Sequence, residues 1–307
     1  MTIDRISDKR TGRIVAPALF SLCVIALAWG AEGEFTIPGF GSIHPSELAP
    51  LAVSPQALEE DLRSLEQAIS PAAPLVSVQD GKATYVGDIS AAGFDALVAT
   101  YAALPAQETI TVLAIDSLGG EIYWGMKIGE LVFANGWDVH VTGHCYSACA
   151  NYVFPAGKRK VLLADSVVGW HGSARQQEAL AEAAGISLEE QFARELVPAM
   201  LEGFARGGMA SPSRELLLPE LAREFGRLNA RRLMEEAFFQ RIGVDAESAV
   251  YGLRADSPLP TGAGGWTYSI ADMAKFGITN VQWQGQGEYP PPGKLAFLGL
   301  TVLEVTR

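Results

Sequence analysis

The chain has 307 residues, of which 49% are hydrophobic and 19% are charged, so it can bury a substantial core and extended disorder is not expected. Its formal net charge of -12 is the opposite of the basic surface that a nucleic-acid-binding protein uses to neutralise phosphates. Nucleic acid is therefore excluded as an expected partner.

The N-terminal segment differs from the rest of the chain. Several arginines and a lysine precede the apolar run IVAPALFSLCVIALAWGA, an order typical of an export signal. The run is also close to the length of about 18 residues that can span a bilayer. Residues 1–31 are therefore predicted to be a cleaved signal peptide or, alternatively, an inner-membrane anchor over residues 14–31. Either alternative places the body outside the cytoplasm, in the periplasm or secreted.

The next segment, residues 32–80, is rich in Pro, Gly, Ala and Ser. Within it, SPQALEEDLRSLEQAI has the pattern of an amphipathic helix in which Ser54 is the N-cap and Pro55 opens the first turn. We interpret this segment as a tether that carries one short helix.

From about residue 82, strand and helix patterns alternate. The strand-like runs are KATYVGDI, TITVLAI, WDVHVTG and KVLLAD, and the helix-like runs are AAGFDALVATYAAL and IYWGMKIGELVFANG, with Gly136 as a C-cap of the second helix. Alternation of this kind predicts an α/β fold with a parallel sheet covered by helices.

Residues 174–262 interrupt this alternation with a helical insert, in which Ser187 and Glu190 form a capping box. The insert could be a lid, an assembly surface or a layer that only packs against the sheet. A short helix capped by Ser269 follows it, and residues 291–307 are expected to be an edge strand or tail.

Three short motifs follow successive predicted strands: DSLGG, CYSAC and GWHGS. The carboxyl ends of parallel strands meet at one edge of the sheet, where ligands usually bind. A serine hydroxyl needs a base to take its proton during nucleophilic attack, and histidine has a suitable pKa. The pattern therefore predicts Ser147 as a nucleophile and His171 as its base.

Backbone amides could complete such a site. Gly119 and Gly120 permit a strained turn with amides that point outward, and the amide of Ala148 would open a helix directly after the serine. Fixed N–H groups of this kind stabilise the negative charge that develops on a carbonyl oxygen during attack.

The segments LAIDSLGGEIYWGMKIGELV, VTGHCYSACANYVFPAGKRKVLLADSVVGWHGS and YSIADMAKFGI resemble the proteolytic subunit of Clp protease and its exported relatives in the ClpP/crotonase superfamily. The likeness covers about 82–173 and 266–283. It implies a parallel sheet with repeated β-β-α and βα units over residues 81–290, a homo-oligomer, and a peptide or protein substrate. It also implies Ser147 and His171 as the catalytic pair, Gly119 and Ala148 as the oxyanion amides, and no cofactor. Because no GxxxxGK[ST] phosphate loop is present, the peptidase is expected to be ATP-independent.

The third member of a Ser-His-Asp triad is not evident. The Clp pattern has an aspartate where gapless alignment on KFG places Gly265, and Asp256 and Asp272 are only weak candidates. This departure motivates an alternative, a catalytically inert ClpP-like scaffold or peptide-binding envelope protein. A third reading, an acyl-CoA hydratase or isomerase of the crotonase branch, is disfavoured by export away from cytosolic CoA. A lysine base is also disfavoured, although Lys158 and Lys160 stay open.

Cys145 and Cys149 flank the serine, one helical turn apart. They could form a disulfide in an oxidising compartment, or they could be two small apolar residues packed under the helix. With four histidines and no clustered Cys/His spacing, no metal site is predicted.

Overall fold

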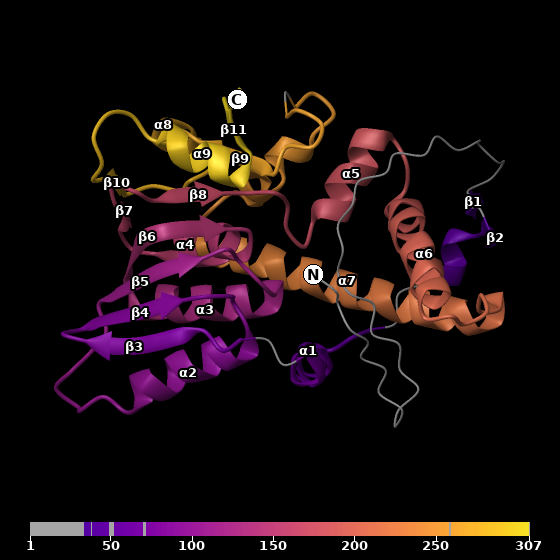
Figure 1. Cartoon of the computed structure of the whole chain (residues 1–307), viewed down its shortest axis with the longest axis horizontal. Helices are drawn as coiled ribbons and strands as arrows, with labels where there is room; N and C mark the ends of the chain where they lie inside the picture. Colours follow the sequence, from indigo (N-terminus) through magenta and orange to yellow (C-terminus); the bar gives the residue numbers. More distant parts are fainter. Residues whose placement is uncertain (1–33, 38, 49–51, 70–71, 258, 307) are drawn as a thin grey trace. The chain divides into compact units, whose positions relative to one another are not determined.

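The computed structural model describes residues 34–37, 39–48, 52–69, 72–257 and 259–306, which group into two compact units (Figure 1). One unit contains residues up to 70 together with 184–230, and the other contains 71–183 and 231–307. The predicted signal peptide or anchor, residues 1–31, lies outside the described residues. Within the described ranges, no helix has both the length and the apolar character needed to cross a membrane.

The larger unit is built on a seven-stranded sheet in which β3 is antiparallel to β4 and every other pairing is parallel. Its order is β10-β7-β6-β5-β4-β3, and β8 pairs with the end of β6. The α/β prediction with a mostly parallel sheet is confirmed. The strands are β3 (Leu75–Gln79), β4 (Lys82–Val86), β5 (Val112–Ser117), β6 (Asp138–Tyr146), β7 (Lys160–Leu162), β8 (Val167–Gly169) and β10 (Val281–Trp283).

Helices follow several of these strands, and local sequence sets where they begin and end. Ser90 caps α2 by accepting the amide of Gly93, and Gly136 ends α3 in the left-handed conformation, as predicted. The helical elements in the first part of this unit are α2 (Ala91–Ala102), α3 (Ile122–Asn135), the π-helix η2 (Cys149–Val153), α4 (Phe154–Ala156) and α5 (Gln176–Ala184). Those in its second part, after the beginning of α7, are η3 (Ala246–Ala249), η4 (Tyr251–Leu253), α8 (Ile270–Lys275) and α9 (Pro292–Leu298).

The ends of this unit differ from the predicted boundaries. The sheet begins at β3, inside the predicted tether, because Asp80 and Gly81 both adopt positive φ and form a tight hairpin turn to β4. At the other end, residues 291–307 contain α9 and β11 (Leu300–Leu303), and β11 pairs in parallel with β9 (Gly265–Tyr268). The C-terminal segment is therefore an integral part of the larger unit.

The smaller unit has a core of its own. Phe192, Leu221 and Phe225 pack with Ile43 and Leu48 in one buried cluster. Part of the predicted tether thus supplies core residues, because its short apolar strands pack against the insert. The elements are β1 (Phe35–Ile37), β2 (Gly41–Ile43), η1 (Pro45–Leu48), α1 (Pro55–Ile69), α6 (Leu188–Arg206) and the first half of α7 (Arg214–Ile242).

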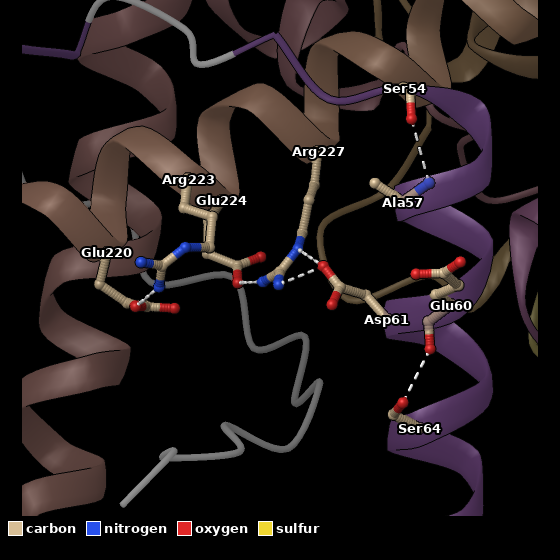
Figure 2. Close-up of polar contacts among 9 residues, drawn as sticks. All are labelled: Ser54, Ala57, Glu60, Asp61, Ser64, Glu220, Arg223, Glu224 and Arg227. Atoms are coloured by element: carbon tan, nitrogen blue, oxygen red, sulfur yellow. Dashed lines mark hydrogen bonds and ion pairs between the residues drawn. The ribbon is translucent and has the colours of Figure 1, made fainter. Parts of the chain in front are cut away.

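Helix α1 is tied to α7 by charged side chains (Figure 2). Arg227 donates to Asp61 over 2.6 and 3.1 Å and also bonds to Glu224 one turn earlier on its own helix. Ser54 accepts the amide of Ala57 at 3.1 Å, so the predicted N-cap of α1 is confirmed. The second half of α7, from residue 231, belongs to the larger unit.

Candidate active site

Ser147 lies at the turn between β6 and the π-helix η2. Its φ is 57°, in the left-handed region that non-glycine residues seldom occupy. Its amide donates to the carbonyl of Gly169 on β8 at 3.0 Å, and its carbonyl accepts the amide of Asn151 at 2.9 Å. A strained strand-to-helix turn of this kind presents a side chain outward from the end of a sheet, as a nucleophile elbow does.

His171 comes from the next crossing of the sheet, two residues after β8. Its Nε2 lies 2.7 Å from the Ser147 Oγ, within hydrogen-bond distance. The ring stacks on Tyr146, with centroids 5.0 Å apart and planes 27° apart. Burial lowers the pKa of His171, so the imidazole is neutral at pH 7 and can accept a proton.

The DSLGG turn lies directly against the serine. Gly119 has a φ of 99°, and a Cβ added there would stand 2.5 Å from the Cβ of Ser147. Its carbonyl accepts the amide of Ile89 at 2.7 Å. The turn therefore needs glycine, both for its backbone conformation and for its close approach to the serine.

The two predicted oxyanion amides differ in their contacts. The N–H of Gly119 donates to the Oγ of Ser117 at 3.1 Å, so it already has an acceptor. The N–H of Ala148 opens the helical segment after Ser147, where amides lack an intrahelical acceptor. Sequence reasoning missed Ser117, although a serine two residues before a turn glycine is a recognised local hydrogen-bonding pattern.

Neither candidate for a third triad member is brought to the histidine. Asp256 is exposed and pairs with Arg254, at 2.9 and 3.0 Å. Asp272 accepts from Ser269 and Lys275, at 2.8 and 2.7 Å. Asp272 also accepts the amide of Val305 at 3.3 Å, so the hydrogen bonds given for both carboxylates go to groups other than the histidine ring.

Gly265 stands where the Clp pattern has its aspartate, and its surroundings explain the absence of a side chain. A Cβ there would lie 3.2 Å from the Cβ of His171 but only 2.1 Å from the carbonyl oxygen of Trp170. The position is next to the histidine, yet the backbone of Trp170 leaves no room for an aspartate. The imidazole instead stacks on the Tyr146 ring and approaches the Ser147 hydroxyl.

Cys145 and Cys149 form a disulfide in the structure, with their Cα atoms 5.1 Å apart. Both residues are fully buried, one on β6 and one at the start of η2. The bond therefore links the two elements on either side of Ser147 and restrains the turn between them.

Reduction of this disulfide is expected to lower the free energy of unfolding by about 2 kcal/mol, because it releases a short covalent loop in the unfolded chain. Urea unfolding with and without dithiothreitol measures the change. The double variant Cys145→Ala/Cys149→Ala is the control and should not respond to the reductant. Equal unfolding midpoints for the oxidised and reduced wild-type protein would contradict this expectation.

The two lysines considered as alternative bases lie away from Ser147. Lys160 begins β7 in register with Val139, near the start of β6, whereas Ser147 follows the end of β6. Its Nζ donates to the carbonyl of Gly157 at 2.7 Å, and Lys158 precedes it at the same end of the sheet. In the described part of the chain, no group of three or more His, Cys, Asp or Glu side chains could hold a metal ion.

No family model and no curated protein matches the chain. It is similar to several solved structures. An enoyl-CoA hydratase from Bacillus halodurans is 12% identical with a TM-score of 0.27, over 59% of this chain and 95% of that one. One from Mycobacterium marinum is 15% identical with a TM-score of 0.28, over 56% and 100%. A methylmalonyl-CoA decarboxylase complexed with 2S-carboxypropyl-CoA is 10% identical with a TM-score of 0.27, over 59% and 95%.

Proposed function

We propose that this chain is a serine hydrolase that cleaves peptide bonds through a Ser147–His171 pair. The observation that carries the proposal is the 2.7 Å approach of the imidazole Nε2 to a serine Oγ held in a left-handed turn. A structural serine at a helix start does not require a neutral imidazole within hydrogen-bond distance, whereas a nucleophile does.

The geometry supports the following steps. The Oγ of Ser147 attacks the carbonyl carbon of the substrate while its proton passes to Nε2 of His171. The negative charge on the carbonyl oxygen is stabilised by the N–H of Ala148 at the positive end of the helical segment. The imidazolium then donates its proton to the leaving amine, and water, activated by the same base, releases the acyl group. Tyr146 holds the ring in the orientation that a triad carboxylate would otherwise maintain.

A catalytically inert scaffold is the second candidate, and one observation favours it. Neither of the two predicted carboxylates reaches His171, and backbone fills the space beside Gly265. An imidazolium without a carboxylate partner is stabilised less, which slows attack. The two candidates differ in whether Ser147 reacts.

Incubation with a fluorophosphonate probe tests the proposal. The expected result is one adduct per chain on the peptide that contains Ser147, absent from Ser147→Ala and from heat-denatured protein. Ser213→Ala, which changes an exposed serine of the smaller unit, should label like the wild-type protein. Unlabelled native protein, or equal labelling of Ser147→Ala, would favour the scaffold. Protection from labelling by peptides, but not by CoA thioesters, would support the substrate class.

A further inference from the structure

Glu235 is a fully buried carboxylate on the second half of α7, outside the pair of residues described above. Burying a carboxylate is costly unless hydrogen bonds replace the water that it loses. Its next neighbour on the helix, Glu236, is exposed. Glu235 is therefore held in the interior by specific partners, and those partners indicate what it does.

Two hydroxyls donate to the carboxylate. The Tyr152 hydroxyl lies 3.0 Å from Oε1, and the Ser173 hydroxyl lies 3.1 Å from Oε2. Tyr152 belongs to η2, the π-helix that begins two residues after Ser147, and Ser173 lies two residues after His171. One carboxylate therefore connects the segment of the proposed nucleophile with the segment of the proposed base.

A backbone amide strengthens the same connection. The N–H of Arg175 donates to the Ser173 hydroxyl at 3.1 Å, and that hydroxyl donates to Glu235. The segment after the histidine is thus held to Glu235 through Ser173.

The side chain of Tyr152 has little freedom to move. Its ring packs against Phe238 and Phe239 of α7, with centroids 5.7 and 6.1 Å away. On the α3 side, a Cβ added at Gly125 would lie only 2.8 Å from its Cδ2. Because the packed ring cannot shift, the position of Glu235 determines the position of η2.

We propose that Glu235 is a positioning residue that holds the Ser147 turn and the His171 segment at the separation needed for proton transfer. This inference rests on the proposed hydrolase function. A misplacement of about 1 Å between reacting groups can lower a rate about a hundredfold, so a fastening of this kind has a measurable effect. Glu235 touches neither the nucleophile nor the base and acts only through Tyr152 and Ser173.

The protonation state of the carboxylate matters to this role. An ionised carboxylate accepts from both hydroxyls, whereas a protonated one turns one of its acceptors into a donor. Burial raises the pKa of Glu235 to about 7, against the hydrogen bonds from Ser173 and Tyr152 and the charge of Arg175. The hydrogen bonds from Tyr152 and Ser173 to Glu235 are therefore expected to become stronger as the pH rises through 7.

The charged groups around Glu235 come from several elements. Arg175 precedes α5 and pairs with Glu178 at 2.7 Å. On α7 itself, Arg231 pairs with Glu121 at 2.9 Å and Arg232 pairs with Glu178 at 2.5 Å. Burial raises the pKa of Tyr152, and the charges of Glu235 and Glu121 raise it further. All three arginines pair with other carboxylates, and the charge of Arg175 is the one that lowers the pKa of Glu235 against the effect of burial.

The variants Glu235→Gln and Glu235→Leu test the proposal, with Glu236→Gln and Glu236→Leu as matched controls. The leucine variant is expected to label at Ser147 about 30-fold to 100-fold more slowly than the wild-type protein. The glutamine variant keeps the shape and should lose less than about tenfold, but the inflection near pH 7 should disappear from its rate profile while the one due to His171 persists. Both control variants should keep the wild-type rate and profile.

Amide hydrogen exchange gives a readout that does not need activity. In Glu235→Leu, and in neither Glu236 variant, exchange should accelerate in both residues 149–153 and 172–175. This measurement stands even if the wild-type protein fails to label, which would overturn the proposed function alone. Acceleration in neither segment, or a glutamine variant with the wild-type rate profile, would overturn the role of Glu235. If the leucine variant does not fold, the glutamine variant supplies both readouts, with the altered rate profile and a smaller acceleration of exchange in the same two segments.

Discussion

Replacing His171 by alanine is expected to lower the rate of fluorophosphonate labelling at Ser147 by about a thousandfold, with the fold retained. In the proposed mechanism, the neutral imidazole, 2.7 Å from the Oγ, accepts the serine proton, and a positioned general base contributes about 10² to 10⁴ to such rates. Stopped-time labelling quantified by mass spectrometry measures the difference. His144→Ala is the matched control, because His144 also lies on the β6 side of the site but pairs with Asp116 at 3.2 Å.

The pH dependence of the labelling rate is a second test of the role of His171. Only the neutral imidazole accepts a proton, and burial lowers the pKa of His171 below its usual 6.5. Wild-type labelling should therefore fall as the pH drops through a value below 6.5, and this fall should be absent in His171→Ala. A variant that keeps both the wild-type rate and its acid limb would remove the histidine from the mechanism.

Replacing Gly119 by alanine is expected to lower the free energy of unfolding by about 3 kcal/mol and to abolish labelling of Ser147. The new Cβ would stand 2.5 Å from the Cβ of Ser147 and 2.7 Å from the carbonyl oxygen of Tyr146, at a φ of 99°. The clash and the backbone strain add, and the serine turn has to move to relieve them. Urea unfolding and probe labelling measure the two effects.

Gly136→Ala separates the contribution of the backbone strain from that of the clash with the serine turn. This residue also has a positive φ, 63°, but a Cβ there would meet no atom within 4 Å. The variant should lose only about 1 kcal/mol and should label normally. Equal losses at positions 119 and 136 would mean that contact with the serine turn has no part in the effect.

The sheet could be predicted because its signals are local. Apolar runs, the caps at Ser54 and Gly136, and motifs after successive strands each depend on a few neighbouring residues. Parallel pairing then brings the strand ends together, so Ser147 and His171 could be paired from chain order alone. The sheet was expected to begin at about residue 82 and begins instead at β3. This strand was not predicted because it is short and half exposed, so its hydrophobic pattern is weak.

The remainder of the site depends on contacts that no local pattern carries. Glu235 is 83 residues from Tyr152 in the sequence and looks like any other glutamate of a charged helix. The positive φ of Ser147 arises from tertiary contacts, since serine itself does not favour it. The resemblance to the Clp pattern assigns the triad aspartate to position 265, and the carbonyl of Trp170 explains why no aspartate fits there.

At position 147 the left-handed backbone conformation favours one residue for stability, and the proposed mechanism requires another. Glycine would adopt this conformation without the penalty of roughly 1 kcal/mol or more that a Cβ incurs there. Selection for stability alone would therefore favour glycine at position 147 and would remove the hydroxyl that the proposed mechanism uses. Stabilising changes are better sought at helix caps and surface charges elsewhere in the molecule.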